Sequence, residues 1–384
     1  MKVKDFIKKY TMILALVIVF ILFTALTGGR LILPQNVSNL LLQNAYVLVM
    51  ACGMLLCILT GGNVDLSVGS TLCLTAAMAA KMMDTGAPAG AAIICSLLVG
   101  ALIGVWQGWL IGYIHIPPFI CTLAGMFLFR GIARVILDSR TISIMDPSFL
   151  NLFTSYIHFP GEENGHVVSA LIIGIIVAVY LTVWTFIRRA QRIKQGYKVE
   201  GFGGAVVKQV IFDALIIAYS YCLMGYKGIP VMILWILAVV LIFAFITSST
   251  VFGRYFYAVG GNEKATKLSG IDPRKVYFWA YFLMSFLAGL SGLLVGARIG
   301  SVDGNMGNSY EMDAIASCFI GGASAYGGSG TVPGIMVGAI LLGVINQGMS
   351  ILGLPDQYQY VVKGAVLLAA VVFDVVSNHK TGKS

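Results

Sequence analysis

The sequence predicts an all-α fold: a polytopic transmembrane helical bundle of about ten to twelve spans, with glycine-broken segments in both halves. Hydrophobic residues make up 58% of the 384 residues and charged residues only 11%, whereas a soluble globular chain carries about 25% charged residues. The mean hydropathy is +0.90, and one soluble core of this length does not bury so much apolar surface, so the excess must face lipid. Glycine is abundant, at 45 residues, and small residues allow membrane helices to pack closely.

Apolar segments of roughly spanning length follow one another along the whole chain. About 20 apolar residues cross the hydrocarbon core of a bilayer. The third and tenth segments are short and flanked by glycine, so each is expected either to span the membrane or to re-enter it. The first is interpreted as a retained span, because residues 27–30 make a poor signal-peptide cleavage site. The segments lie near 11–27, 40–59, 67–83, 89–114, 118–137, 167–187, 207–224, 229–247, 276–299, 312–326, 333–352 and 359–377.

Charges near the ends of the spans predict the orientation, because basic residues concentrate in cytoplasmic loops. Lys and Arg are in excess in the N-terminal segment, the 188–208 loop and the 248–275 loop, which we place in the cytoplasm together with the C-terminal tail. The chain 1–384 is thus expected to form a single transmembrane domain with both termini cytoplasmic. Acidic residues dominate two loops that we place outside: Asp138, Asp146, Glu162 and Glu163 in one, and Asp303, Glu311 and Asp313 in the other.

Composition and motifs exclude several classes of function. The net charge of +9 comes from basic residues in short loops, and no nucleic-acid-binding motif is present, so nucleic acid is not an expected partner. The seven cysteines form no CxxC pair and the four histidines are scattered, so no metal site is predicted. The final TGKS, 381–384, mimics the end of a phosphate-binding loop, but Ser377 holds the earlier glycine position. No catalytic residue and no cofactor bound by this chain are therefore predicted.

Two glycine-rich segments interrupt apolar runs, one in each half of the chain: GGNVDLSVGS, 61–70, and GGASAYGGSGTVPG, 321–334. Paired breaks of this kind mark the translocation region of many transporters. Asp65 lies among apolar neighbours in the first segment, and two interpretations stay open: a helix cap at a tight turn, or contact with a substrate. A further small-residue repeat predicts a helix-packing face and consists of Gly100, Gly104, Gly108 and Gly112.

The stretch AVGGNEKATKLSGIDPRKV, 258–276, predicts a short isolated helix on the cytoplasmic side. Gly260 and Gly261 are expected to release the preceding chain, Asn262 to cap the helix, and Ser269–Gly270 to end it. A helix of about two turns is marginal alone. It is interpreted either as an element that inserts into a groove on a partner or as a plain amphipathic connector.

These motifs, in this order, resemble the sugar-importer permeases of the ribose, xylose and galactose group. GNEKATKLSGI, 261–271, resembles the coupling segment of that family, with Thr266 where alanine is usual. The segment 61–70 resembles its first-half signature, with Val64 where isoleucine is usual, and 321–334 resembles the corresponding second-half segment. The resemblance implies that the cytoplasmic coupling loop 254–275 meets an ATPase through Gly261, Asn262, Glu263, Ala265, Leu268, Ser269 and Gly270.

The resemblance implies an ATP-binding-cassette importer made of several chains in a prokaryotic cell membrane. This chain is then its membrane-spanning permease subunit, and the cargo is a monosaccharide such as xylose, ribose or galactose. The expected partners are a cassette ATPase subunit that uses the ATP, an extracytoplasmic sugar-binding protein, a second permease subunit in a homodimer, and the lipid bilayer. This chain itself is then not an enzyme. The alternative is an ATP-independent secondary sugar transporter or facilitator, although a proton-coupled carrier would bury more carboxylates than Asp65 and Asp213. A membrane scaffold is disfavoured by the glycine breaks.

A neutral sugar requires polar groups for its hydroxyls and a flat apolar surface for its C–H face. For each candidate residue the alternative role is structural, as a helix-to-helix hydrogen bond or an interface aromatic. Arg130, Arg134 and Asp213 also lie near membrane segments, where ion pairing or snorkelling is expected rather than substrate contact. The predicted substrate pathway comprises Gln43, Asn44, Tyr46, Asp65, Asn346 and Gln347, with Trp106, Gln107 and Trp109 as further options.

Overall fold

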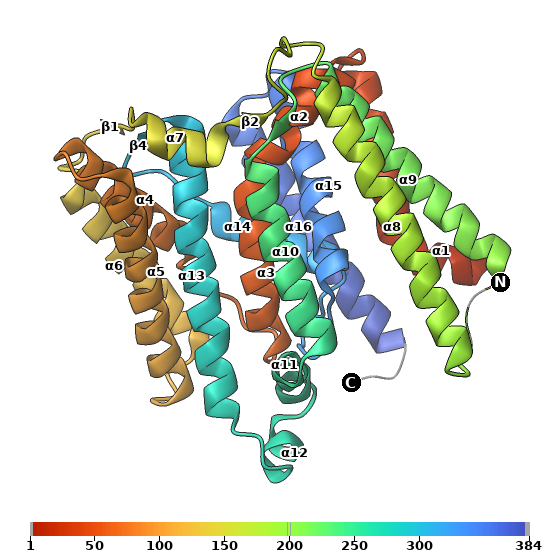
Figure 1. Cartoon of the computed structure of the whole chain (residues 1–384). Coiled ribbons are helices and arrows are strands. Elements are labelled where there is room, and N and C mark those ends of the chain that lie inside the picture. The colour runs from red at the N-terminus through yellow and green to blue at the C-terminus, as the bar shows by residue number, and fades with distance from the viewer. Residues whose placement is uncertain (1–2, 198, 200, 381–384) are drawn as a thin grey trace.

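The computed structural model describes residues 3–197, 199 and 201–380, and within them it confirms the all-α bundle (Figure 1). The TGKS tail and parts of the N-terminal segment and of the 188–208 loop lie outside these residues. The helices are α1 (Val3–Leu26), η1 (Arg30–Ile32), α2 (Pro34–Gln43), α3 (Ala45–Leu59), α4 (Val68–Asp84), α5 (Ala89–Gly112), α6 (Pro118–Ile136), α7 (Pro147–Thr154), α8 (Val168–Lys194), α9 (Phe202–Met224), α10 (Met232–Ser249), α11 (Val251–Gly261), α12 (Glu263–Leu268), α13 (Pro273–Ile299), α14 (Tyr310–Ile320), α15 (Val332–Ile351) and α16 (Asp356–Lys380).

Eight helical stretches of the described chain are long and apolar enough to cross a membrane, and α2 and α3 count together as one of them. Two shorter apolar helices, Met12–Leu26 and Gln357–Val372, lie within α1 and α16. The two short segments that the sequence left open are α4 and α14. At 1.5 Å per residue, the 11 residues of α14 extend about 16 Å, roughly half of the hydrocarbon thickness. We therefore assign α14 as a segment that does not span the membrane.

The centre of the bundle is formed by α3, α4 and α13. Every residue of α3 is buried, and this helix needs no polar face because other helices surround it. The predicted glycine face of α5 packs against α13: Gly104 lies against the backbone of Phe282, and Gly108 against that of Phe278. Side chains at these positions would hold the two helices apart, so the small-residue repeat serves packing within this chain.

The two ends of the bundle carry different elements (Figure 1). At one end, which we call the β end, lie α7 and four two-residue strands: β1 (Ile142–Ser143), β2 (Tyr156–Ile157), β3 (Ile229–Pro230) and β4 (Ser301–Val302). The strands form two antiparallel pairs, β1 with β4 and β2 with β3. The other end, which we call the α12 end, carries the isolated helix α12. Helices α8 and α9 form a hairpin at the edge of the bundle.

The structure corrects three expectations about the loops. The 188–208 loop is shorter than predicted, because α8 continues to Lys194 and α9 begins at Phe202. The 248–275 loop contains a helix that hydropathy did not indicate, α11. Glu311 and Asp313 were expected in an outside loop, but both are buried in the first turn of α14.

Candidate substrate pocket and coupling helix

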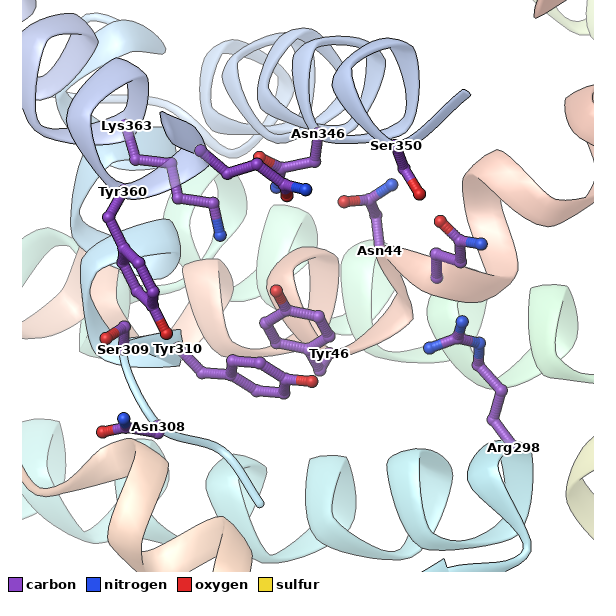
Figure 2. Close-up of a pocket in the computed structure, with 12 residues that line it drawn as sticks. Asn44, Tyr46, Arg298, Asn308, Ser309, Tyr310, Asn346, Ser350, Tyr360 and Lys363 are labelled. Atoms are coloured by element: carbon purple, nitrogen blue, oxygen red, sulfur yellow. The ribbon is translucent and has the colours of Figure 1, made fainter. Parts of the chain in front are cut away.

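A polar pocket of about 360 Å³ lies toward the β end of the bundle, where five segments distant in sequence meet. Figure 2 shows the labelled side chains pointing from these segments into one shared space. Amides, hydroxyls and tyrosine rings dominate, which suits a small solute rich in hydroxyl groups. The lining residues are Gln43, Asn44 and Tyr46 around the α2–α3 junction, Arg298 on α13, Asn308, Ser309 and Tyr310 at the start of α14, Asn346 and Ser350 on α15, and Gln359, Tyr360 and Lys363 on α16.

Four of the six predicted pathway residues line this pocket: Gln43, Asn44, Tyr46 and Asn346. Their meeting was not evident from the sequence, because about 300 residues separate Asn346 from the other three. Asn44 also has a structural role, since its side-chain N–H donates to the carbonyl of Leu40 at 2.6 Å at the break between α2 and α3. The carboxamide oxygen of Asn346 is buried and accepts no hydrogen bond from the described residues.

The other two predicted pathway residues lie elsewhere. Gln347 is buried on the neighbouring face of α15, where its amide donates to the carbonyl of Asn36 at 2.6 Å. Asp65 is fully buried just before α4, and its Oδ1 accepts from the backbone N–H and the hydroxyl of Ser67 at 2.8 and 2.7 Å. This arrangement is the tight turn of the first interpretation, and Asp65 is not among the residues that line the pocket.

None of the three further options, Trp106, Gln107 and Trp109, lines the pocket. Gln107 is buried; it donates to Ser67 Oγ at 2.7 Å and accepts from Ser285 at 3.1 Å, so it joins α4, α5 and α13. Trp106 and Trp109 are 39% and 50% exposed on the outer face of α5. Three charged side chains bond to other protein groups: Arg130 to the carbonyl of Met306, Arg134 to Asn305 Oδ1, and Asp213 to Thr182 and Gln209.

A buried network closes the inner side of the pocket. The rings of Tyr46 and Tyr310 stack with centroids 3.8 Å apart. Asp313 Oδ2 accepts from the Tyr46 hydroxyl at 2.6 Å and from Lys363 Nζ at 2.9 Å. The network thereby ties α3, α14 and α16 together. The side chain of Asp313 is 1% exposed and that of Lys363 is 21% exposed, so the pair is shielded from bulk water and is only weakly screened by salt.

Sequence reasoning missed several lining residues, above all Arg298, Tyr310 and Lys363. Arg298 and Lys363 could have been found from the sequence, because an ionisable residue within an apolar helix is rarely placed there without a partner or a function. Arg298 is the penultimate residue of α13, and the described residues offer it no ion pair or hydrogen bond. In Figure 2 its guanidinium points into the space opposite Lys363.

The isolated helix forms as predicted within one residue. Asn262 Oδ1 accepts from the N–H of Ala265 at 2.9 Å at the start of α12, and Gly270 follows its end with φ +85°. Leu268 is 90% exposed at the tip of this helix, so its large apolar side chain is not buried by packing within the chain. Thr266 is buried and donates to the carbonyls of Ala258 and Asn262 at 2.8 and 2.7 Å, which fastens α12 to the end of α11.

Helix α13 begins close to α12, and Asp272 caps its first turn. Asp272 accepts from the backbone N–H of Arg274 at 3.1 Å and from its guanidinium at 3.0 and 3.2 Å. These hydrogen bonds, with the guanidinium contribution the largest, hold the pKa of Asp272 below its ordinary value. A groove of about 460 Å³ lies between α12 and the start of α13, with His115, Glu263, Lys267 and Gly270 in its wall.

The glycine pair before α12 acts differently from the prediction. Gly260 and Gly261 do not release the chain, because both belong to the last turn of α11. Gly260 packs so closely that a Cβ there would overlap the carbonyl oxygen of Leu59. The absent side chain therefore allows α11 to touch the end of α3.

The two glycine-rich breaks meet at this same place, which we call the glycine junction and define as residues 59–62, 260–261 and 325–330. The N–H of Gly328 donates to the carbonyl of Leu59 at 3.0 Å. Gly62 approaches the carbonyl of Ala325 with no room for a Cβ, and the Tyr257 hydroxyl donates to the carbonyl of Gly330 at 2.9 Å. Helix α3 runs from the pocket to this junction, and α14 and α15 each have one end near the junction and line the pocket with the other.

Comparisons with known proteins identify the family to which the chain belongs. The family model described as "Branched-chain amino acid transport system / permease component" matches residues 36–371. The chain is 33% identical over 373 residues to the xylose transport system permease protein of Haemophilus influenzae, covering 97% of both chains. It is 34% identical over 374 residues to the xylose transport system permease protein of Escherichia coli K12, covering 97% of this chain and 93% of that one.

A second group of relatives is named for ribose. The chain is 33% identical over 341 residues to the ribose import permease protein of Escherichia coli K12, covering 88% of this chain and 85% of that one. No solved structure matches the chain. The resemblance that the three motifs predicted is thus confirmed, and the chain belongs to the family of transport-system permease components that includes the bacterial xylose and ribose permeases.

Proposed function

We propose that this chain is the membrane-spanning subunit of an ATP-binding-cassette importer that carries a monosaccharide across the cell membrane, with a pentose such as xylose or ribose as the first candidate. The observation that carries the proposal is the polar pocket, joined by three helices to the glycine junction beside α12. The relatives named for xylose and ribose support the substrate class. The alternative of an ATP-independent secondary carrier finds no support among these relatives.

The pocket supports transport of a neutral sugar. Its volume of about 360 Å³ lies in the lower part of the range of small-molecule sites, about 300 to 1,000 Å³. The amides of Gln43 and Asn346 and the hydroxyl of Ser350 offer both donors and acceptors to sugar hydroxyls. The Tyr310 ring, which stacks on the buried Tyr46 ring, offers the flat apolar surface that the C–H face of a sugar requires.

The energy source is proposed to be a separate cassette ATPase that receives α12. The exposed Leu268 and the groove beside Glu263 and Lys267 suit docking of another protein. Gly261, Asn262, Ala265, Ser269 and Gly270 shape this element through the helix end, the cap and the turn. The further partners are an extracytoplasmic sugar-binding protein that meets the β end and a second copy of this chain. This assignment requires the α12 end and both termini to lie in the cytoplasm.

Coupling is proposed to follow the connected elements. A push on α12 reaches α11 through Thr266, and α11 reaches α3 and the 321–334 segment through Gly260. A rigid, buried α3 then carries the displacement to Asn44 and Tyr46 at its other end. Such a movement shifts the bundle between two states only to the extent that the cassette binds them with different affinity.

Reconstitution tests the proposal directly. Proteoliposomes with this chain and its cognate cassette and binding protein are expected to take up labelled xylose or ribose only when ATP is supplied. Uptake should persist when a protonophore collapses the proton gradient while ATP is held constant. Sugar uptake by this chain alone, or uptake that stops with the gradient, would overturn the ATP-driven assignment in favour of a secondary carrier.

A further inference from the structure

A basic cavity of about 570 Å³ lies between α8 and α9, at the turn of the hairpin. Three arginines line it, and none of its described lining residues is acidic. The cavity is separate from the sugar pocket, with which it shares no lining residue. Its walls are formed by Trp184, Thr185, Arg188, Arg189, Gln191, Arg192, Gln195, Val199 and Ala205.

The arginines continue an aromatic row along one face of α8. Tyr180, Trp184, Arg188 and Arg192 recur every four residues and so lie above one another on the helix. The guanidinium carbon of Arg188 lies 3.9 Å from the centroid of the Trp184 ring. Because tryptophan prefers the interface between hydrocarbon and headgroups, this contact holds the arginine head at the level of lipid phosphates.

The surface next to the row is apolar and open. Tyr180 is 65% exposed on α8, and Val207, Val210 and Ile211 are 58% to 60% exposed on α9. Figure 1 places this hairpin at the edge of the bundle. An acyl chain lying along these side chains would bring its own headgroup to the arginines, whereas a soluble anion gains nothing from them.

The positive charges of the cavity are not neutralised by the described protein. Arg188 and Arg189 contact aromatic rings, the latter 5.9 Å from the centroid of Phe202. Asp213, the acidic residue of α9, is already bonded to Thr182 at 2.6 Å and to Gln209 at 2.9 Å. Three neighbouring guanidinium groups repel one another, and a phosphate between them removes that repulsion.

We propose that this cavity binds the phosphate headgroup of an anionic phospholipid, such as phosphatidylglycerol or cardiolipin. The planar guanidinium fork matches phosphate oxygens in pairs, and basic pockets between helices on the cytoplasmic side suit anionic headgroups. The lipid then fastens the peripheral α8–α9 hairpin to the membrane surface. The proposal does not depend on what the protein transports.

Native mass spectrometry of the full chain in detergent tests the proposed lipid site, with phosphatidylglycerol and phosphatidylcholine as the two probes. Phosphatidylglycerol should remain bound and phosphatidylcholine should not. In the variant Arg188→Gln/Arg189→Gln/Arg192→Gln, affinity for phosphatidylglycerol should fall roughly tenfold or more, since each basic residue near an anionic surface adds several-fold to binding. The matched control Arg254→Gln/Lys264→Gln/Lys267→Gln removes three charges from the same end outside the cavity and should retain the lipid.

Further measurements distinguish a lipid headgroup from other ligands of the cavity. Inorganic phosphate and glycerol phosphate at millimolar concentration should not displace the lipid; equal competition would identify a soluble anion and overturn the proposal. Equal loss of lipid in both triple variants would mean that the overall positive charge of this end binds the lipid, and it would overturn a specific site in the cavity. If the cavity variant keeps phosphatidylglycerol with unchanged affinity, the arginines do not bind the headgroup and the proposal is overturned. Size-exclusion profiles and melting temperatures establish that each variant is folded, and Trp184→Phe should weaken lipid binding less than the triple variant does.

Discussion

The backbone N–H of Gly328 donates a 3.0 Å hydrogen bond to the carbonyl oxygen of Leu59, which joins the second-half glycine break to the end of α3. Gly260 packs against the same carbonyl from the side of α11. Three segments separated by up to 270 residues thus share one backbone oxygen. The close approach depends on absent side chains, so it can be broken by adding a single methyl group.

The first prediction concerns that methyl group. Gly260→Ala places a Cβ onto the Leu59 carbonyl and into contact distance of the Gly328 backbone, so α11 must move away from α3. We expect sugar uptake to fall at least tenfold, measured in cells with the cognate cassette. Gly131→Ala on α6 is the matched control, because a Cβ at that position also meets nothing within 4 Å; it should transport normally. Normal uptake by Gly260→Ala would refute a coupling role for the junction.

The second prediction concerns the buried pair below the pocket. Asp313→Asn leaves Lys363 without its ion pair, and breaking a fully buried pair costs about 3–5 kcal/mol. The cost here should be smaller, because Lys363 is 21% exposed. Adding Lys363→Met to Asp313→Asn should restore part of the loss. The melting temperature of the double variant should therefore fall by less than the sum of the decreases in the two single variants. Thermal unfolding in detergent measures this, and strict additivity would mean that the pair does not interact.

The third prediction concerns α12. Leu268→Glu should abolish uptake without changing membrane abundance, because the side chain is 90% exposed and supports no packing within this chain. Leu268→Met keeps an apolar side chain of similar size and should retain uptake. Ala265→Glu and Gly270→Val should also uncouple transport; at Gly270, φ +85° strains any side chain by about 1 kcal/mol or more. The readout is co-purification of the cassette together with uptake. Full uptake by Leu268→Glu would remove α12 from the coupling path.

The fourth prediction concerns the pocket. Asn346→Ala removes an amide whose oxygen has no partner in the described protein, so folding should be little affected. The KM for sugar uptake should rise about tenfold, which corresponds to about 1.4 kcal/mol of lost binding, while ATP-dependent coupling persists. Trp106→Phe, on the outer face of α5, serves as the control and should leave KM unchanged. An unchanged KM in Asn346→Ala would take this residue out of the sugar path.

The fifth prediction concerns orientation. Single cysteines at Lys264, on α12, and at Gln195, beside α8, should react with an impermeant thiol reagent only after the cells are opened. A cysteine at Met145, which is 81% exposed near the β end, should react in intact cells. The background requires replacement of the native cysteines, of which Cys95 and Cys222 are only partly buried. Labelling at Lys264→Cys from outside would invert the proposed topology.

Most helix boundaries could be predicted to within a few residues because lipid imposes a one-dimensional rule. A run of apolar residues must be helical to satisfy its backbone hydrogen bonds, and it must end where water returns. The segments expected at 89–114 and 118–137 correspond to α5 and α6 in this way. Helix α11 escaped prediction because it is amphipathic and lies beside the bundle rather than across it, so its mean hydropathy carried little signal.

The candidate site was predictable only in part. Gln43, Asn44, Tyr46 and Asn346 were found because polar residues in apolar segments are rare, and rarity is visible in sequence. The same criterion selected Gln347, which donates to the distant carbonyl of Asn36, and Asp65, which accepts from Ser67 two residues away. Hydropathy indicates how deep a residue lies, but it does not indicate which face of the helix turns toward the pocket, and a shift of one residue turns a side chain by about 100°.

The sequence by itself determined the class of molecule, the spans, the two glycine breaks and the isolated helix, because composition, periodicity and capping act over a few neighbouring residues. Only the tertiary structure decided that the two breaks and Gly260 meet at one carbonyl, and that Arg298 and Lys363 face one another across the pocket. Those contacts join residues hundreds of positions apart. They depend on how whole helices pack, and helix packing is decided by the joint shape of many side chains rather than by any local pattern.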